Sequence, residues 1–354
     1  MVPILQLIAL VIITEGRDIA SYICSNWTKV ALICRTVNRA SSHHFLHMPA
    51  KWVGLLLNCR CKLLNHWDGK MGQCSVLVTG PRTSLVVALS HLLRVPIPDR
   101  KRKVKVPEAV KVCIIDTLRR SINDNGRRLS NGTSSLRRIQ GGESFVWACN
   151  GGDTCGSILV WHIATCIFDV KDPYRRDQER GSPPISYSHH KIAATHLSRY
   201  CAYLVTWCPE LLPDDNDAWI KSLYKVVKKD AERALAGHAL ARSSSSSTPE
   251  EEYQKLVELL SANSKHEVLK KGVKLGKQLV ETIDSEEMVW KLLAEFWSEM
   301  ILYVALSDNL KGHSEAIARG GELITLLWAL LFHAGIVSRP GEEDGAAATS
   351  AGAV

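Results

Sequence analysis

The sequence predicts a mainly α-helical protein, an irregular helical bundle with a short apolar N-terminal helix and a basic connecting segment. Apolar residues recur three or four positions apart through most of the C-terminal half, which is typical of amphipathic helices. Capping signals precede two of these segments, and the same half contains no convincing strand alternation. A chain of 354 residues with 46% hydrophobic and 23% charged residues is long enough to bury a sizeable core.

Changes in composition divide the chain into successive parts. We expect a partial, membrane-proximal helical region at 1–93, a basic connecting segment at 94–150, a C-terminal helical domain at 151–338 that contains a Ser-rich linker at 242–249, and a disordered tail at 339–354. The positive charge lies entirely in the N-terminal part. Residues 94–138 hold thirteen Lys and Arg against four Asp and Glu, whereas residues 139–354 hold twenty-two against twenty-nine. This asymmetry indicates attraction to anionic membrane or nucleic acid.

The N-terminal helices allow two interpretations. The apolar run from Val2 to Ile13 is too short to cross a bilayer alone, because a span needs about 20 residues. It also lacks the basic start and the cleavage site of a signal peptide. In residues 19–39, apolar positions recur at helical spacing with basic side chains beside them. That pattern fits an interfacial membrane helix and a soluble core helix equally well.

The densest charge run contains five basic side chains that are candidates for contact with a membrane or with anionic lipid. They are Arg100, Lys101, Arg102, Lys103 and Lys105. A nuclear import signal, a nucleic-acid patch and a solvated surface loop remain alternatives. Nucleic acid is the weakest functional alternative, because no aromatic residue between Trp67 and Phe145 is present to stack on bases. Prolines around the run predict an extended connection there.

Apolar periodicity predicts helices on both sides of the serine run at 243–247. Upstream they are expected at Glu108–Arg120, Ser157–Val170, His189–Trp207 and Trp219–Leu240. The second of these carries His162, and a lone histidine in an apolar helix is usually a satisfied core residue. Downstream, Thr248 and Glu251 have the spacing of a capping box, with Pro249 at the first helical position. Asp284 and Glu287 repeat that spacing before the next helix.

The last helix is expected to run from Glu315 or Glu322 to His333, and the segment around it holds the one constellation that resembles a metal site. Its members are Glu299, His313, Glu322 and His333. Converging carboxylate and imidazole groups bind divalent metals. The alternative is that Glu322 and His333 lie at the two ends of the last helix, where the helix dipole favours each charge. Three ligands at a standard metal spacing are absent, so no metal ligand is assigned.

The sequence favours a non-enzymatic protein without a cofactor. Eleven cysteines include no C-x-x-C pair, which leaves no common zinc or redox motif and favours free buried thiols in a reducing compartment. No phosphate-binding loop, nucleophile elbow, H-E-x-x-H pair or kinase signature occurs.

Two sets of residues carry a family resemblance. The C-terminal set is Leu159–Thr165, Leu197, Ser198, Tyr200, Tyr203, Leu204, Pro209–Pro213, Trp297, Glu299, Met300, Tyr303, His313, Ala316, Arg319–Leu323, Thr325, Trp328, His333 and Gly335. It resembles the C-terminal domain of a large plant family, the domain of unknown function numbered 594. The N-terminal set is Leu32–Arg35, Val104–Pro107, Val110, Lys111, Asn131, Gly132 and Trp147–Cys149. It resembles the end of the partner domain numbered 4220.

The resemblance implies a location rather than an activity. Family members usually carry several membrane-spanning helices upstream, so we expect this chain to be a truncated member that is membrane-associated, with its bulk cytoplasmic. The expected function is a non-enzymatic helical interaction module on the cytoplasmic face of a membrane, with an unidentified protein partner and contact with anionic lipid. A metal-dependent enzyme using the Glu/His cluster, a soluble nucleic-acid binder and a truncated non-functional product remain alternatives.

Overall fold

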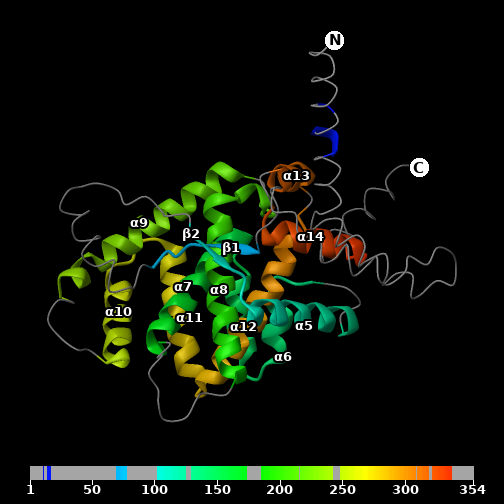
Figure 1. The fold of residues 1–354 in the computed structure, drawn as a ribbon. Helices are drawn as coiled ribbons and strands as arrows, with labels where there is room; N and C mark the ends of the chain where they lie inside the picture. Colours follow the sequence, from blue (N-terminus) through cyan, green and yellow to red (C-terminus); the bar gives the residue numbers. More distant parts are fainter. Residues whose placement is uncertain are drawn as a thin grey trace, which may run out of the picture. The chain divides into compact units, whose positions relative to one another are not determined.

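The computed structural model describes residues 11, 14–16, 69–77, 102–124, 129–173, 185–214, 216–241, 248–307, 309–318 and 321–336. Its described residues are mainly helical, which confirms the predicted fold class (Figure 1). The chain divides into a larger unit, residues 70–309 with 338–354, and a smaller unit, residues 1–69 with 310–337. The expected helices at Val2–Ile13 and 19–39 and the serine run at 243–247 lie almost entirely outside the described residues. Within the described residues, no helix is long and apolar enough to cross a membrane.

The larger unit combines helices with a small sheet. Its elements are β1 (Lys70–Gln73), β2 (Arg102–Lys105), α5 (Glu108–Asp124), α6 (Thr133–Arg138), the 3₁₀ helix η1 (Gly142–Cys149), α7 (Thr154–Lys171), α8 (Ile185–Trp207), the 3₁₀ helix η2 (Pro209–Leu211), α9 (Asp217–Ala241), α10 (Pro249–Asn263), α11 (Glu267–Thr282) and α12 (Glu286–Ala305). Helices α5, α7, α8 and α9 occupy the four positions predicted upstream of the serine run, each a few residues longer than expected.

Helix α7 forms the centre of the larger unit. Every residue from Cys155 to Phe168 is buried, as expected for a helix that is apolar on all sides. It packs against α8, α10 and α11. Aromatic residues of α12 reach it as well, since Trp161 stacks on Phe296 with ring centroids 3.8 Å apart. The indole N–H of Trp297 also donates a hydrogen bond to the hydroxyl of Thr165 over 3.0 Å.

Two glycines allow α11 to approach α7 closely. Gly272 and Gly276 lie one turn apart and face Ile163 and Ile167 of α7. A Cβ atom added at Gly272 would lie 2.7 Å from the Cβ of Ile163, which is closer than van der Waals contact permits. At Gly276 the nearest atoms of Ile167 would be 3.1 Å away. Because glycine has no side chain, Gly272 and Gly276 determine how closely α11 approaches α7.

Carboxylates hold both ends of α7. At its N-terminus, Asp153 accepts a hydrogen bond from the amide of Gly156, and Asp214 accepts from the amides of Thr154 and Cys155 at 3.1 and 2.8 Å. These bonds satisfy amides that have no partner inside the helix. Asp214 follows η2 in the chain, so its side chain ties a distant loop to the start of α7.

At the C-terminal end of α7, the carboxylate of Asp172 accepts hydrogen bonds from side chains of two other helices. Tyr187 and Lys191 of α8 both donate to it, and the indole N–H of Trp290 from α12 donates over 2.6 Å. The side chain of Lys191 is 4% exposed, and its ammonium lies 5.0 Å from the centroid of the Trp290 ring. Because a buried ammonium requires a counter-charge, Asp172 and Lys191 depend on each other.

The helix starts of the C-terminal half agree with the sequence at one position and differ at another. The capping box of Thr248 and Glu251 is present at the start of α10, as predicted. The start of α12 was wrongly assigned to Asp284, because the hydroxyl of Ser285 caps the helix by accepting from the amide of Met288. Between these starts the chain forms two helices, and a separate start for α11 was not predicted.

The start of α11 depends on α9. The carboxylate of Asp230, which is 4% exposed, accepts hydrogen bonds from the amides of Lys265 and His266 at 2.8 and 2.7 Å. Burial alone would raise the pKa of Asp230, but these amides and the neighbouring Arg233 outweigh that effect and lower it. Asp230 of α9 thus holds the two residues before α11, while the side chain of His266 caps the helix by accepting from the amide of Val268 at 3.2 Å.

The smaller unit contains α13 (Leu310–Ala318) and α14 (Leu323–His333) among its described residues. The last helix was expected to begin at Glu315 or Glu322 and to end at His333. The second start is confirmed, since Glu322 is the N-cap of α14, whereas Glu315 lies with His313 in the separate helix α13. Gly321, at φ 81°, lies between the two helices, in a conformation that favours glycine.

We predict that Gly272→Ala destabilises the larger unit by about 1–3 kcal/mol, because the new Cβ would overlap Ile163. Gly276→Ala should change the free energy of unfolding by less than about 1 kcal/mol, since the gain in helix propensity offsets a milder contact. Urea unfolding of both variants, followed by circular dichroism, measures the difference. Equal effects of the two substitutions would contradict a close crossing centred on Gly272.

Candidate functional site

The described part of the basic segment is a strand. Arg102, Lys103 and Lys105 belong to β2 and are exposed, whereas Arg100 and Lys101 lie outside the described residues. Strand β2 pairs antiparallel with β1 in a two-stranded sheet. The prolines correctly indicated extended backbone here, but nothing in the sequence predicted the pairing with β1.

The register of this sheet gathers lysines on one face. Lys105 is paired with Lys70, and Lys103 with Gly72. Because alternate residues of a strand point to the same face, Lys70, Lys103 and Lys105 share a face of the sheet. Lys70 and Lys105 lie directly opposite each other, where like charges destabilise a sheet, and Gly72 on the same face packs against Tyr203 of α8. The sheet is anchored from β1, since the side-chain amide of Gln73 donates to the carbonyl of His196 in α8 over 3.1 Å.

Glu299, one of the four candidate metal ligands, is engaged in capping α6. Its side chain is buried, and it accepts hydrogen bonds from the Ser130 hydroxyl at 2.6 Å and from the Ser135 amide at 2.7 Å. The residue before α6, Gly132, makes no side-chain cap of its own and has φ 94°. A Cβ at Gly132 would also lie 2.3 Å from the Phe296 ring. Glu299 therefore supplies the hydrogen-bond acceptor at the start of α6 that Gly132, which has no side chain, cannot supply.

The other three candidates lie in the smaller unit and do not form a shared ligand set. Glu322 precedes the first residue of α14 and His333 is its last residue. At 1.5 Å per residue they are about 16 Å apart along the helix axis, so a single ion cannot bind both. Both positions instead suit the helix dipole, with a carboxyl group at the N-terminus and an imidazole at the C-terminus. Across the described ranges, no group of three or more His, Cys, Asp and Glu side chains is arranged to hold a metal ion.

His313 is packed as an apolar ring. It is buried in α13 and stacks on Trp328 with centroids 4.6 Å apart and an interplanar angle of 14°. Neither ring nitrogen has a hydrogen-bond partner. Burial lowers the pKa of His313 to about 4, so the ring is neutral near pH 7.

His162 is the satisfied core histidine that its sequence context indicates. Its Nε2 accepts from the amide of Val76 at 3.1 Å, and its Nδ1 lies 2.8 Å from the hydroxyl of Ser198. Since Nε2 is an acceptor, the proton is on Nδ1 and is donated to Ser198. Burial, together with the charge of Arg199, lowers the pKa of His162 to about 3. Both ring nitrogens are therefore committed to structure.

Cys166 lies beside His162 but is not an activated nucleophile. Its sulfur is 3.6 Å from Nε2 of His162, the atom already used by Val76. Burial raises the pKa of Cys166 to about 11, so the thiol is protonated near pH 7. A thiolate is required for nucleophilic or metal chemistry. All seven cysteines within the described ranges are free thiols.

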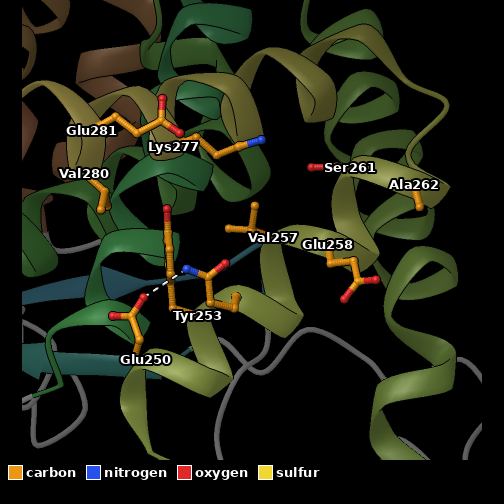
Figure 2. A pocket seen from close by; sticks show the side chains of 10 residues that line it. Glu250, Tyr253, Val257, Glu258, Ser261, Ala262, Lys277, Val280 and Glu281 are labelled. Atoms are coloured by element: carbon orange, nitrogen blue, oxygen red, sulfur yellow. Dashed lines mark hydrogen bonds between the residues drawn. The ribbon is translucent and has the colours of Figure 1, made fainter.

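A surface groove of about 600 Å³ lies between α10 and α11. Figure 2 shows Tyr253 extending from α10 between the side chains of the two helices, with Val257 beside it. Glu250 and Glu258 of α10 and Glu281 of α11 give the groove an acidic lining, which also includes Lys277. Sequence reasoning missed this groove because α11 was not recognised as a separate helix.

The chemistry of the groove is limited by existing contacts. Glu250 forms an ion pair with Lys171 and accepts from the side chain of Gln254 at 3.0 Å. Burial and the nearby carboxylates of Glu281 and Glu250 raise the pKa of Tyr253, which keeps its hydroxyl protonated. The residues that line the groove include no histidine and no cysteine, so they offer hydrogen bonds and charge rather than an acid–base pair.

The fold and its contacts define a mainly helical protein whose most distinctive residues lie in the interior. Residues 282–336 match the family described as "Protein of unknown function, DUF594", and residues 5–79 match the "Domain of unknown function (DUF4220)". The two resemblances predicted from the sequence are confirmed over these residues. No curated protein and no solved structure matched the chain.

The matching motifs in the larger unit are packing residues. Trp161 stacks on Phe296, Trp297 bonds to Thr165, and Tyr203 lies against Gly72 of β1. Glu299 caps a helix. Trp297 and Glu299 lie within the matched residues 282–336, and their contacts join segments that are distant in the sequence.

We predict that Glu299→Gln lowers the free energy of unfolding by about 1.5–3 kcal/mol, because an amide nitrogen replaces one of two buried acceptors. The exposed Glu258→Gln is the matched control and should change stability by less than about 0.5 kcal/mol. Urea unfolding, with and without added zinc or manganese, measures both. If zinc or manganese raised the free energy of unfolding of the unmodified chain but not that of Glu299→Gln, Glu299 would be a metal ligand rather than a helix cap.

A second prediction concerns acid. Between about pH 6.5 and pH 3, His162 is protonated in the unfolded chain but stays neutral in the folded chain. The free energy of unfolding should therefore fall with pH in this window, by up to about 1.4 kcal/mol per unit from this residue. His162→Gln retains an acceptor and a donor without the titration. The difference in pH slope between the two chains isolates the histidine, and identical slopes would exclude its buried neutral state.

Proposed function

We propose that the chain is a non-enzymatic helical interaction module that contacts an anionic membrane surface from the cytoplasmic side. The observation that supports this proposal is the exposure of Arg102, Lys103 and Lys105 on β2, with Lys70 across from Lys105. A strand holds these side chains in a fixed arrangement, unlike the flexible loop that is the alternative for such a sequence. The basic charge of residues 94–138 points the same way.

The strength of such a contact follows from the number of cations. Each Lys or Arg near an anionic leaflet contributes about 1 kcal/mol, and the contribution falls off within a Debye length. The three lysines that share a face of the sheet would then supply about 3 kcal/mol, which supports weak, reversible attachment but not permanent anchoring. This range suits a module that holds a protein partner close to a membrane.

The state of the buried functional groups supports a non-enzymatic role. His162 and His313 have lowered pKa values and are neutral, and the thiol of Cys166 is protonated. A general base needs a pKa near the operating pH and access to a substrate proton. The two histidines are buried, which denies them that access.

We predict that the full chain sediments with phosphatidylcholine vesicles that contain about a third phosphatidylserine, and that binding weakens steeply with salt. The variant Arg102→Gln, Lys103→Gln, Lys105→Gln should bind about thirtyfold more weakly, because Lys103 and Lys105 each contribute about 1 kcal/mol while Arg102 lies on the other face of the sheet. The matched control is Lys265→Gln, Lys270→Gln, Lys271→Gln, which removes the same charge from exposed positions in and before α11.

The outcomes separate the alternatives. If the β2 variant and the α11 control lost vesicle binding equally, the net charge of the chain rather than the position of the cations would determine binding. Binding to neutral vesicles but not to anionic ones would exclude the electrostatic contact. Salt-dependent binding to duplex DNA or RNA, without binding to vesicles, would favour the nucleic-acid alternative.

A further inference from the structure

The outward face of α9 combines exposed apolar side chains with lysines. Trp219 is 43% exposed and Val226 is 49% exposed, and they lie seven residues apart, which places them on one stripe of the helix. Lys221, Lys225 and Lys229 recur every four residues and are exposed; Lys229 lies nearest to the stripe of Trp219 and Val226, and Lys225 and Lys221 lie progressively further round the helix. From Trp219 to Lys229 the helix contains four lysines and no acidic residue.

The inner contacts of α9 determine which face points outward. Ile220, Tyr224 and Val227 are buried. The hydroxyl of Tyr224 lies 2.9 Å from the sulfur of Cys74, the residue after β1. Asp230, the first acid after the lysines, is turned inward to the start of α11. Figure 1 shows α9 at the outside of the larger unit.

The start of α9 fixes the position of Trp219. The side chain of Asn216 accepts a hydrogen bond from the Trp219 amide over 2.9 Å, which is a helix cap. Trp219 therefore belongs to the ordered first turn of the helix rather than to the preceding loop. Two acids adjoin the face, Asp217 before it and Glu232 after it.

We propose that this face of α9, formed by Trp219, Val226, Lys221, Lys225 and Lys229, inserts into the headgroup region of an anionic bilayer. A tryptophan suits that position because its ring is largely apolar and its indole N–H remains available to water. Lysines extend their charged ends to the phosphates while their stems cover apolar surface. The arrangement is that of a helix lying in the plane of an interface.

The charge of the face favours a bilayer over a protein groove. A protein partner for Trp219 and Val226 would have to present carboxylates to three lysines over two turns of helix. An anionic leaflet supplies negative charge along the entire face and needs no defined register. The inference shares its partner class with the proposed function but rests on other residues, so each can fail without the other.

Two variants test the face. Lys221→Gln, Lys225→Gln, Lys229→Gln should weaken binding of the full chain to vesicles with about a third phosphatidylserine about a hundredfold, at roughly fivefold per lysine. Trp219→Ala, Val226→Ser should weaken it about tenfold without changing its salt dependence. The control pair Val112→Ala, Ile115→Ala removes equally exposed apolar side chains from α5 and should leave binding unchanged.

A depth measurement identifies insertion directly. Lipids brominated on their acyl chains should quench part of the tryptophan fluorescence of the full chain, and Trp219→Phe should remove that part. Unchanged binding of both α9 variants, with no quenching assigned to Trp219, would overturn the inference while a loss in the β2 variant would still support the proposed function. Weaker binding of the α9 variants, with unchanged binding of the β2 variant, would support insertion of α9 and contradict the proposed contact through β2. Binding to polyglutamate but not to vesicles would overturn both in favour of an acidic protein partner.

Discussion

The close approach of α11 to α7 is the constraint on which the larger unit depends. Helix α7 is apolar on every side, so each side requires a covering element. Helix α8 and the aromatic residues of α12 cover two sides, and α11 covers a third only because Gly272 and Gly276 leave room for Ile163 and Ile167. The groove between α10 and α11, and the inward turn of Asp230, both follow from the position of α11.

The sequence predicted those parts of the fold that depend on neighbouring residues. The periodicity of α5, α7, α8 and α9, and the capping box at Thr248, are local signals, and all were found. The start of α11 was missed because its N-cap is His266, which is not a typical capping residue, and because Asp230, which holds the amides of Lys265 and His266, lies 35 and 36 residues before them. The pairing of β1 with β2 was missed for the same reason, since neither four-residue strand shows alternation long enough to recognise.

The same distinction applies to the candidate sites. That His162 would be a satisfied core residue was predictable from its apolar helix, but its partners Val76 and Ser198 were not. Glu299 was considered as a metal ligand because sequence alone cannot reveal Ser135, 164 residues away, as its hydrogen-bond donor. Spacing along α14 was more informative, because the distance between Glu322 and His333 excludes a shared ion without any knowledge of tertiary structure.

The carboxylate of Asp230 also has a consequence for how the protein opens. Helix α9 cannot leave the bundle without exposing Asp230 and leaving the amides of Lys265 and His266 without their acceptor. Local opening of α9 therefore also frees the backbone of Lys265 and His266 just before α11, and the two segments behave as one cooperative unit. Any ligand that holds α9 in place would slow amide exchange at the start of α11, even though it touches no residue there.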